Sequence, residues 1–148
     1  MLSMFIGAAA IAAQPFTQSV EADTPEHAIR SFFQAAASDD ERAYLRLTSS
    51  RFYAFDAGKR FTGREFFDTV KSLHSSGTVL QWNLGPIDVH MSGSTAWAAW
   101  ENHGAVGKPN AMQPMSWLES AALHRSGHRW TLDFLHSNRM DPPSPPKS

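Results

Sequence analysis

The stretch from Trp117 to Arg139 constrains the fold of this chain more than any other segment. It contains two runs in which apolar and polar residues alternate, and the pair Ser126-Gly127 separates them. A period of two is the pattern of β-strands that bury one face. One face of the first run carries Trp117, Glu119, Ala121 and Leu123, and one face of the second carries Trp130, Leu132, Phe134 and His136. The sequence therefore predicts a long terminal β-hairpin.

Three helices are expected ahead of this hairpin, each marked by a capping residue. Thr24 is followed by Pro25, Ser38 by Glu41 and Thr62 by Glu65, which are favoured combinations at a helix N-terminus. The apolar positions of these helices are Ile29, Phe32, Phe33 and Ala36, then Ala43, Tyr44 and Leu47, then Phe66, Phe67, Val70 and Leu73. Gly77 is expected to end the third helix, because glycine tolerates the left-handed conformation common there.

The remaining segments read as strands and turns. A short hairpin carries Phe52, Phe55 and Phe61 around the turn Asp56-Ala57-Gly58. A strand is expected over Val79–Met91 with a break at Gly85-Pro86, a turn at Gly93-Ser94, a strand over Thr95–Val106 and a loop over Gly107–Pro114. Helices followed by an antiparallel sheet predict an α+β fold.

Both ends of the chain are expected to lie outside the folded domain, which spans residues 24–140. Residues 1–13 are apolar, and Ala10-Ile11-Ala12 forms an A-x-A cleavage motif, so we expect a signal peptide and a periplasmic or secreted protein. An uncleaved, disordered arm is the alternative. The run is too short for a stable membrane anchor. Residues 14–23 read as a linker, and 141–148 as a disordered proline-rich tail.

Composition excludes several classes of function. The net charge is −1 and the basic residues are scattered, which argues against a nucleic-acid partner. The chain has no cysteine, so disulfides and thiolate chemistry are excluded. Its seven histidines form no helical ligand pair, so no metal site is expected. No serine lies in a G-x-S-x-G elbow, which argues against covalent catalysis by serine.

Three short motifs, in the order given by these elements, resemble the SnoaL-like family. They are Gly63-Arg64-Glu65, Gly93-Ser94-Thr95-Ala96 before a long strand, and Gly127-His128-Arg129-Trp130 leading to Leu135-His136-Ser137. This family belongs to the nuclear transport factor 2-like (cystatin-like) superfamily, which includes ketosteroid isomerase. The resemblance implies a cone in which a curved antiparallel sheet wraps the N-terminal helices around a pocket. It also implies a homodimer through the outer sheet face, and it leaves the activity open.

The strand beginning at Thr95 supplies the first candidate catalytic pair. Trp97, Ala99, Glu101 and His103 share one face, and similarity to ketosteroid isomerase implies that this face points into the cone. Glu101 would then orient His103 as a general base. Two alternatives are that both residues lie on a solvated or dimer face, or that they form a structural ion pair.

Asp56 is the other catalytic candidate, because the isomerase carries its aspartate base at the corresponding place. The alternative is an ordinary turn residue, since Asp-Ala-Gly is favourable turn chemistry. The positions that match the isomerase's oxyanion-binding tyrosine and aspartic acid are Phe32 and Ala121. Neither side chain donates a hydrogen bond, which argues against steroid isomerisation.

Six further residues are expected to contact a ligand: Phe32, Tyr53, Trp97, Trp117, Glu119 and His136. A packed strand residue is the alternative for His136, and Asp133 is expected to pair with an arginine or a histidine. The predicted function is proton transfer on a small apolar or aromatic molecule without a cofactor, as in an isomerase, dehydratase or hydratase. The alternatives are a non-catalytic carrier and a dimeric interaction module with a filled cavity.

Overall fold

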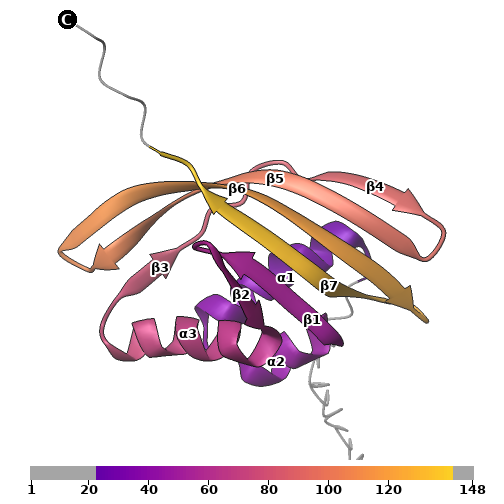
Figure 1. Ribbon diagram of the computed structural model, residues 1–148, viewed down its shortest axis with the longest axis horizontal. Helices are drawn as coiled ribbons and strands as arrows, with labels where there is room; N and C mark the ends of the chain where they lie inside the picture. The colour runs from indigo at the N-terminus through magenta and orange to yellow at the C-terminus, as the bar shows by residue number, and fades with distance from the viewer. Residues whose placement is uncertain (1–22, 142–148) are drawn as a thin grey trace, which may run out of the picture.

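The computed structural model describes residues 23–141, in which three helices pack against one face of a curved seven-stranded sheet (Figure 1). The predicted signal peptide, residues 1–13, lies outside the described residues, as do 14–22 of the linker and 142–148 of the tail. No helix among residues 23–141 is both long and apolar enough to cross a membrane.

The helices are α1 (Pro25–Ala37), α2 (Glu41–Leu47) and α3 (Gly63–Ser75). Two of the predicted caps are confirmed. The Thr24 hydroxyl accepts from the His27 backbone N–H at 3.1 Å, and Thr62 with Glu65 forms a complete capping box. The cap expected at Ser38 is wrong. The first helix runs on to Ala37, and the Ser38 hydroxyl donates to the Gln34 carbonyl oxygen of that helix. Asp40 caps α2 instead, by accepting from the Ala43 backbone N–H.

The strands are β1 (Thr48–Asp56), β2 (Lys59–Thr62), β3 (Val79–Gln81), β4 (Asp88–Ser92), β5 (Thr95–Lys108), β6 (Ala111–Ser126) and β7 (Arg129–Arg139). The sheet order is β2-β1-β7-β6-β5-β3, and β4 also pairs with β5. All pairs are antiparallel except β1 with β7. The predicted α+β architecture is confirmed, with a sheet that is mixed and mostly antiparallel.

Two predicted segment boundaries need correction. The loop expected over Gly107–Pro114 is wrong, because β5 and β6 stay paired as far as Lys108 and Ala111. Pro114 fits this strand because the ladder between β6 and β7 begins only at Trp117, which leaves the proline at an unpaired edge. The break expected at Gly85-Pro86 is present but longer, because residues 82–87 separate β3 from β4.

Gly104 allows the chain after α3 to cross close to β5. A Cβ atom at this position would lie 1.8 Å from the Gln81 carbonyl oxygen, which is far inside van der Waals contact. Only glycine therefore permits β3 to pair with β5 along this stretch. This pairing positions Leu80 and Trp82 at the side of the interior cavity described below.

The core lies between the helices and the inner sheet face. Its centre is an aromatic cluster in which Phe32 contacts Phe33, Tyr44, Phe52 and Phe66, with ring centroids 5.1–6.1 Å apart. The predicted inward face of β6 is confirmed, because Trp117, Glu119, Ala121 and Leu123 are all buried. Phe32 is fully buried and does not line the cavity.

The inward face of β5 is the opposite of the expected one. Ala96, Ala98, Trp100 and Asn102 are buried, whereas Trp97, Glu101 and His103 are exposed on the outer face. The small side chains of Ala96 and Ala98 join the core formed with α1, and Phe33 packs edge-on against Trp100 at 6.1 Å. Trp97 therefore lies outside, because it alternates with Ala96 and Ala98, whose small side chains face the core.

A β-bulge changes the inward face of β7 along its length. The register with β6 shifts between Ala122 and Leu123, which leaves Asp133 as the extra residue. Trp130 and Leu132 are buried before the bulge, and Leu135 and Ser137 are buried after it. Phe134 and His136, expected on the face of Trp130, therefore lie on the outer face. Asp133 pairs with a histidine, as expected: its Oδ2 atom lies 2.8 Å from Nδ1 of His124.

Candidate functional site

Glu119 is the carboxyl group that the fold buries most deeply, with 5% of the residue exposed. It projects from β6 toward the helices, and three side-chain donors hold it. The Trp100 indole N–H donates to Oε2 at 2.6 Å, the Asn102 amide to the same oxygen at 3.0 Å, and the Ser137 hydroxyl to Oε1 at 2.9 Å. Adjacent strands β5 and β7 supply these donors, so the sheet itself fixes the carboxyl group.

Asn102 is in turn oriented by the backbone. Its Oδ1 atom accepts from the Asn83 N–H at 2.9 Å, which leaves the amide nitrogen to face Glu119. Asn102 is fully buried, and a buried polar group is retained only when its hydrogen bonds are satisfied. The segment between β3 and β4 thus controls the geometry of Glu119 through one amide side chain.

Asp56 ends β1 and lies at the opening of the same interior space. It precedes the two-residue turn Ala57-Gly58, in which both residues have positive φ angles of 49° and 73°. Such a turn matches the twist of a hairpin and folds β2 back along β1. Asp56 is half-buried, so it can exchange protons with solvent while it borders the interior.

An interior cavity of about 100 Å³ separates the helices from this part of the sheet. Asp56, Glu119 and Ser137 are its charged or strongly polar members, and Thr69 adds a hydroxyl group. The other lining residues are apolar or aromatic: Phe33, Phe61, Phe66, Val70, Leu73, Leu80, Trp82 and Trp117. The cavity thus holds two carboxyl groups within a largely apolar wall.

The pKa values of both carboxyl groups are raised above their ordinary ranges. Burial is the main cause for each. For Asp56, a hydrogen bond from the Ala57 backbone lowers the pKa in part. For Glu119, the donors Asn102, Ser137 and Trp100 lower it in part, and the negative charge of Asp56 raises it further. The more exposed Asp56 therefore ionises first, and its charge opposes ionisation of Glu119.

Among residues 23–141, no three histidine, aspartate or glutamate side chains come together as metal ligands.

Comparison with known protein families identifies the chain. A model of the SnoaL-like domain matches residues 26–140, which include every helix and strand except the start of α1. The chain belongs to the SnoaL-like domain family. The SnoaL-like protein has no match among curated protein sequences.

Solved structures resemble the SnoaL-like protein in fold. A ketosteroid isomerase-like protein from Erwinia carotovora atroseptica has a TM-score of 0.65 at 14% identity, covering 86% of this chain and 100% of that chain. The CaMKII hub of S. rosetta has a TM-score of 0.65 at 18% identity, covering 88% and 100%. An NTF2-like protein of unknown function in nutrient uptake from Rhodospirillum rubrum has a TM-score of 0.66 at 12% identity, covering 79% and 98%. These matches support the nuclear transport factor 2-like fold.

Three of the predicted site residues of the SnoaL-like protein line the cavity: Asp56, Trp117 and Glu119. Tyr53, Trp97 and His136 lie on the outer sheet face instead. Tyr53 packs against Phe134 there, the exposed His136 lies edge-on to Phe55, and Trp97 stacks on His90 at 4.0 Å. The expectation that Glu101 and His103 point into the cone is wrong, because β5 presents its other face to the helices.

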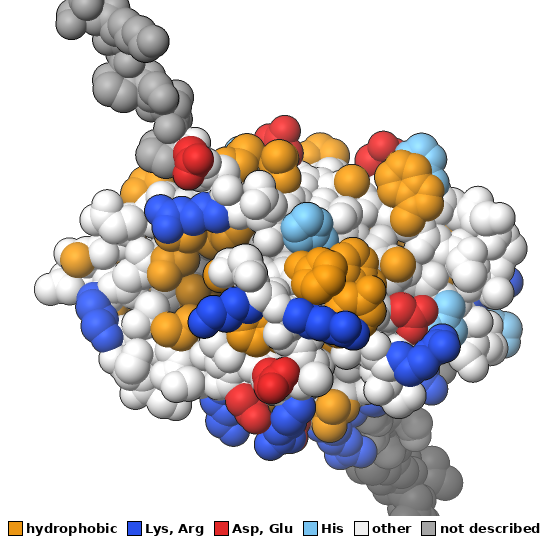
Figure 2. All heavy atoms as spheres, viewed as in Figure 1, with side chains coloured by type: hydrophobic (Ala, Val, Ile, Leu, Met, Phe, Trp, Pro, Cys, Tyr) orange, Lys and Arg blue, Asp and Glu red, His pale blue; other side chains and the backbone are white. Residues whose placement is uncertain are grey.

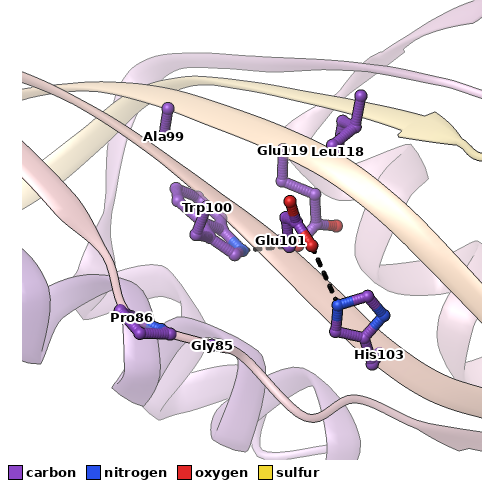
Figure 3. A pocket seen from close by; sticks show the side chains of 8 residues that line it. All are labelled: Gly85, Pro86, Ala99, Trp100, Glu101, His103, Leu118 and Glu119. Carbon is purple, nitrogen blue, oxygen red and sulfur yellow. Dashed lines mark hydrogen bonds and ion pairs between the residues drawn. The ribbon is translucent and has the colours of Figure 1, made fainter.

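Glu101 and His103 border another open hollow, of about 480 Å³ (Figure 3). Its lining also includes Trp100 and Glu119, and Glu119 borders the interior cavity as well. The His103 ring contacts Glu101 at 3.0 Å and the Ser116 hydroxyl at 2.8 Å. The Glu101 and His103 side chains are 62% and 58% exposed, so water solvates both. Figure 3 shows this exposed pair beside the link between Trp100 and Glu119.

The sequence reasoning missed Trp100, Asn102 and Ser137 as the residues that hold Glu119. A signal for two of them was present, because Trp100 and Asn102 share a face that contains no charged residue. Ser137 follows the bulge at Asp133, so simple alternation along β7 assigns it to a different face from Trp130.

Proposed function

We propose that this SnoaL-like protein binds a small apolar molecule in its interior cavity and transfers a proton with Asp56 and Glu119. The observation that carries the proposal is the pair of carboxyl groups in a largely apolar cavity, both with raised pKa values. Perturbed titratable groups that converge in a concave site are characteristic of acid–base catalysis.

The different surroundings of the two groups suggest different roles. Asp56 lies at the opening and ionises first, so it is the proton acceptor. Glu119 is fixed by three donors and retains its proton to higher pH, so it donates a hydrogen bond or a proton to the bound molecule. Two carboxyl groups whose environments separate their pKa values can supply a base and an acid in one site.

A generic substrate with one acidic C–H bond tests this proposal. We expect the protein to accelerate the ring opening of neutral 5-nitrobenzisoxazole, measured by absorbance of the phenolate product. Asp56→Asn should reduce the rate by about a hundredfold or more, the usual contribution of a positioned general base. Asp68→Asn is the matched control, because Asp68 lies on α3 in an exposed ion pair with Arg64.

The outcome separates the alternatives. Binding of the probe without acceleration, or equal rates for Asp56→Asn and the parent protein, would contradict proton transfer and leave a carrier. Absence of binding would favour an interaction module, in which the cavity only completes the core.

We further propose a homodimer through the outer sheet face. Trp97, Leu118 and Phe55 are exposed there by 53%, 48% and 41%, and a large apolar surface of this kind marks an interaction site. Figure 2 shows hydrophobic side chains gathered over β1 and β7, with Lys and Arg side chains around them. The description of one structural relative as a CaMKII hub supports an assembling role for this fold.

We also propose export to the periplasm or the outside of the cell, on the basis of residues 1–13. Fractionation of cells that express the full chain, followed by mass spectrometry of the N-terminus, tests this. An intact Met1 in the cytosolic fraction would contradict it.

A further inference from the structure

A second hollow lies immediately outside the opening of the interior cavity. It has a volume of about 520 Å³ and is bordered by the β1–β2 turn and by the end of β7. Asp56 and Ser137 line both this hollow, here called the vestibule, and the cavity itself. The two spaces therefore adjoin at these side chains, and Phe55 and His136 of the outer face also line the vestibule. A ligand that extends from the cavity past Asp56 would enter the vestibule.

The size of the cavity makes such an extension necessary. A closed apolar cavity of about 150 Å³ accommodates benzene, and this one, at about 100 Å³, is smaller. It therefore accepts only part of a molecule of ordinary metabolite size. The remainder of the ligand lies in the vestibule, so the lining of the vestibule determines the chemistry at that end.

The charge of the vestibule is predominantly positive. Lys59, Arg60 and Arg139 line it, and its one carboxyl group is Asp56. None of the three cations forms an ion pair within residues 23–141. The Arg60 guanidinium lies over the Tyr53 ring at 4.3 Å, which directs it to the outer face.

Lys59 and Arg139 occupy the inner side of the rim. In the strand register Lys59 is opposite Asp56, and Arg139 is opposite Trp117, and both of these partners line the cavity. The two cations thus flank the route from cavity to vestibule. An arginine guanidinium pairs with a carboxylate through two parallel N–H bonds, and a lysine adds a point charge.

We infer that the ligand is an apolar molecule with a carboxylate group, whose apolar end enters the cavity while its carboxylate lies between Lys59 and Arg139. This inference rests on the proposed function, since it names the class of molecule that the cavity receives. Two cations at one rim match a single anionic group. The apolar wall of the cavity and its small volume match an alkyl end.

Matched pairs of probes test the inference. The probes are octanoate with octanamide and hexanoate with hexanamide, titrated calorimetrically into the full chain at low and at moderate salt. The two chain lengths make the result independent of any one alkyl end. The variants are Lys59→Gln and Arg139→Gln. Lys71→Gln is the control, because it removes an equal charge from an exposed position on α3.

We expect each carboxylate to bind more tightly than its amide by on the order of tenfold, because two exposed ion pairs contribute. Each of Lys59→Gln and Arg139→Gln should weaken binding of the carboxylate by about two- to fivefold and leave binding of the amide unchanged. The preference should shrink as salt increases, since exposed charges are screened. Lys71→Gln should change neither member of a pair.

Equal binding of amide and carboxylate would overturn the inference but leave the proposed function in place. If Lys71→Gln weakened carboxylate binding equally, the inference would also be overturned, because the loss of affinity would then follow from the net charge of the protein. If none of the four probes binds, the cavity does not receive apolar ligands, and the proposed function fails together with the inference.

Discussion

Glu119 shows how a single residue couples the chemistry of the site to the stability of the fold. Its carboxyl group is buried among Trp100, Asn102 and Ser137, and burial raises its pKa. The unfolded chain exposes the same group to water, where it ionises near its ordinary value of about 4.3. The folded state therefore loses stability as the pH rises above that value, because it resists an ionisation that the unfolded state accepts.

We predict that Glu119→Gln gains stability relative to the parent protein between about pH 4 and pH 7. The amide oxygen can accept from Trp100 and Asn102, and the amide nitrogen can donate to Ser137, so the network survives. Urea unfolding at several pH values measures the difference in the free energy of unfolding between the two proteins. A tenfold difference in the acid constant between the folded and unfolded states corresponds to about 1.4 kcal/mol. A relative gain for Glu119→Gln toward low pH would contradict the prediction.

The exposed pair Glu101 and His103 should behave differently from Glu119. We predict that Glu101→Ala and His103→Ala each change the free energy of unfolding by less than about 1 kcal/mol, the usual limit for an exposed ion pair. Neither should reduce turnover of 5-nitrobenzisoxazole, since both residues lie on the outer face. Thermal unfolding and the rate assay measure these effects. A loss of turnover without loss of stability would contradict this prediction and indicate that Glu101 or His103 takes part in catalysis.

At the scale of elements, α3 covers the cavity, and its N-terminal capping box holds it in place. Thr69, Val70 and Leu73 of this helix line the cavity, and Thr62 begins the helix. We predict that Thr62→Ala destabilises the protein by about 1 kcal/mol, because the Glu65 backbone N–H loses its acceptor. Urea unfolding measures this loss. Ser75→Ala on the same helix removes an exposed hydroxyl that does not cap, and should cost less.

Two strands show what the sequence can and cannot predict. Alternation assigns the inward face of β6 correctly, because the extra residue of the bulge lies in β7 and not in β6. It fails along β7, since the extra residue at Asp133 exchanges the two faces and no local pattern announces it. On β5 the alternation is correct, but the choice between faces depends on α1, which approaches Ala96 and Ala98. That choice is a tertiary property.

The candidate site was predictable to a similar extent. The resemblance to ketosteroid isomerase identifies Asp56, and the regular alternation of β6 identifies Trp117 and Glu119. The donors to Glu119 come from β5, whose inward face was misassigned, and from β7, whose bulge the alternation does not reveal. The network around Glu119 therefore required the three-dimensional structure.

At the scale of the whole molecule, the two sheet faces have separate tasks. The inner face holds the cavity and its carboxyl groups, while the outer face presents Trp97, Leu118 and Phe55 to solvent. An exposed apolar surface on a curved sheet is a liability for an isolated molecule, because it favours association. The proposed homodimer covers this surface, and it would lie next to the vestibule, because Phe55 lines the vestibule as well.

We predict that Leu118→Glu converts the protein from dimer to monomer, because two like charges would be buried together in a symmetric interface. Sedimentation velocity over a range of protein concentrations measures the change in mass. The control is Leu45→Glu, since Leu45 is a comparably exposed leucine, at 57%, on α2, away from the outer sheet face. It should leave the dimer intact, and both variants should retain the parent's circular dichroism spectrum. A monomeric parent protein at every concentration, or an equal effect of both variants, would contradict a dimer through the outer face.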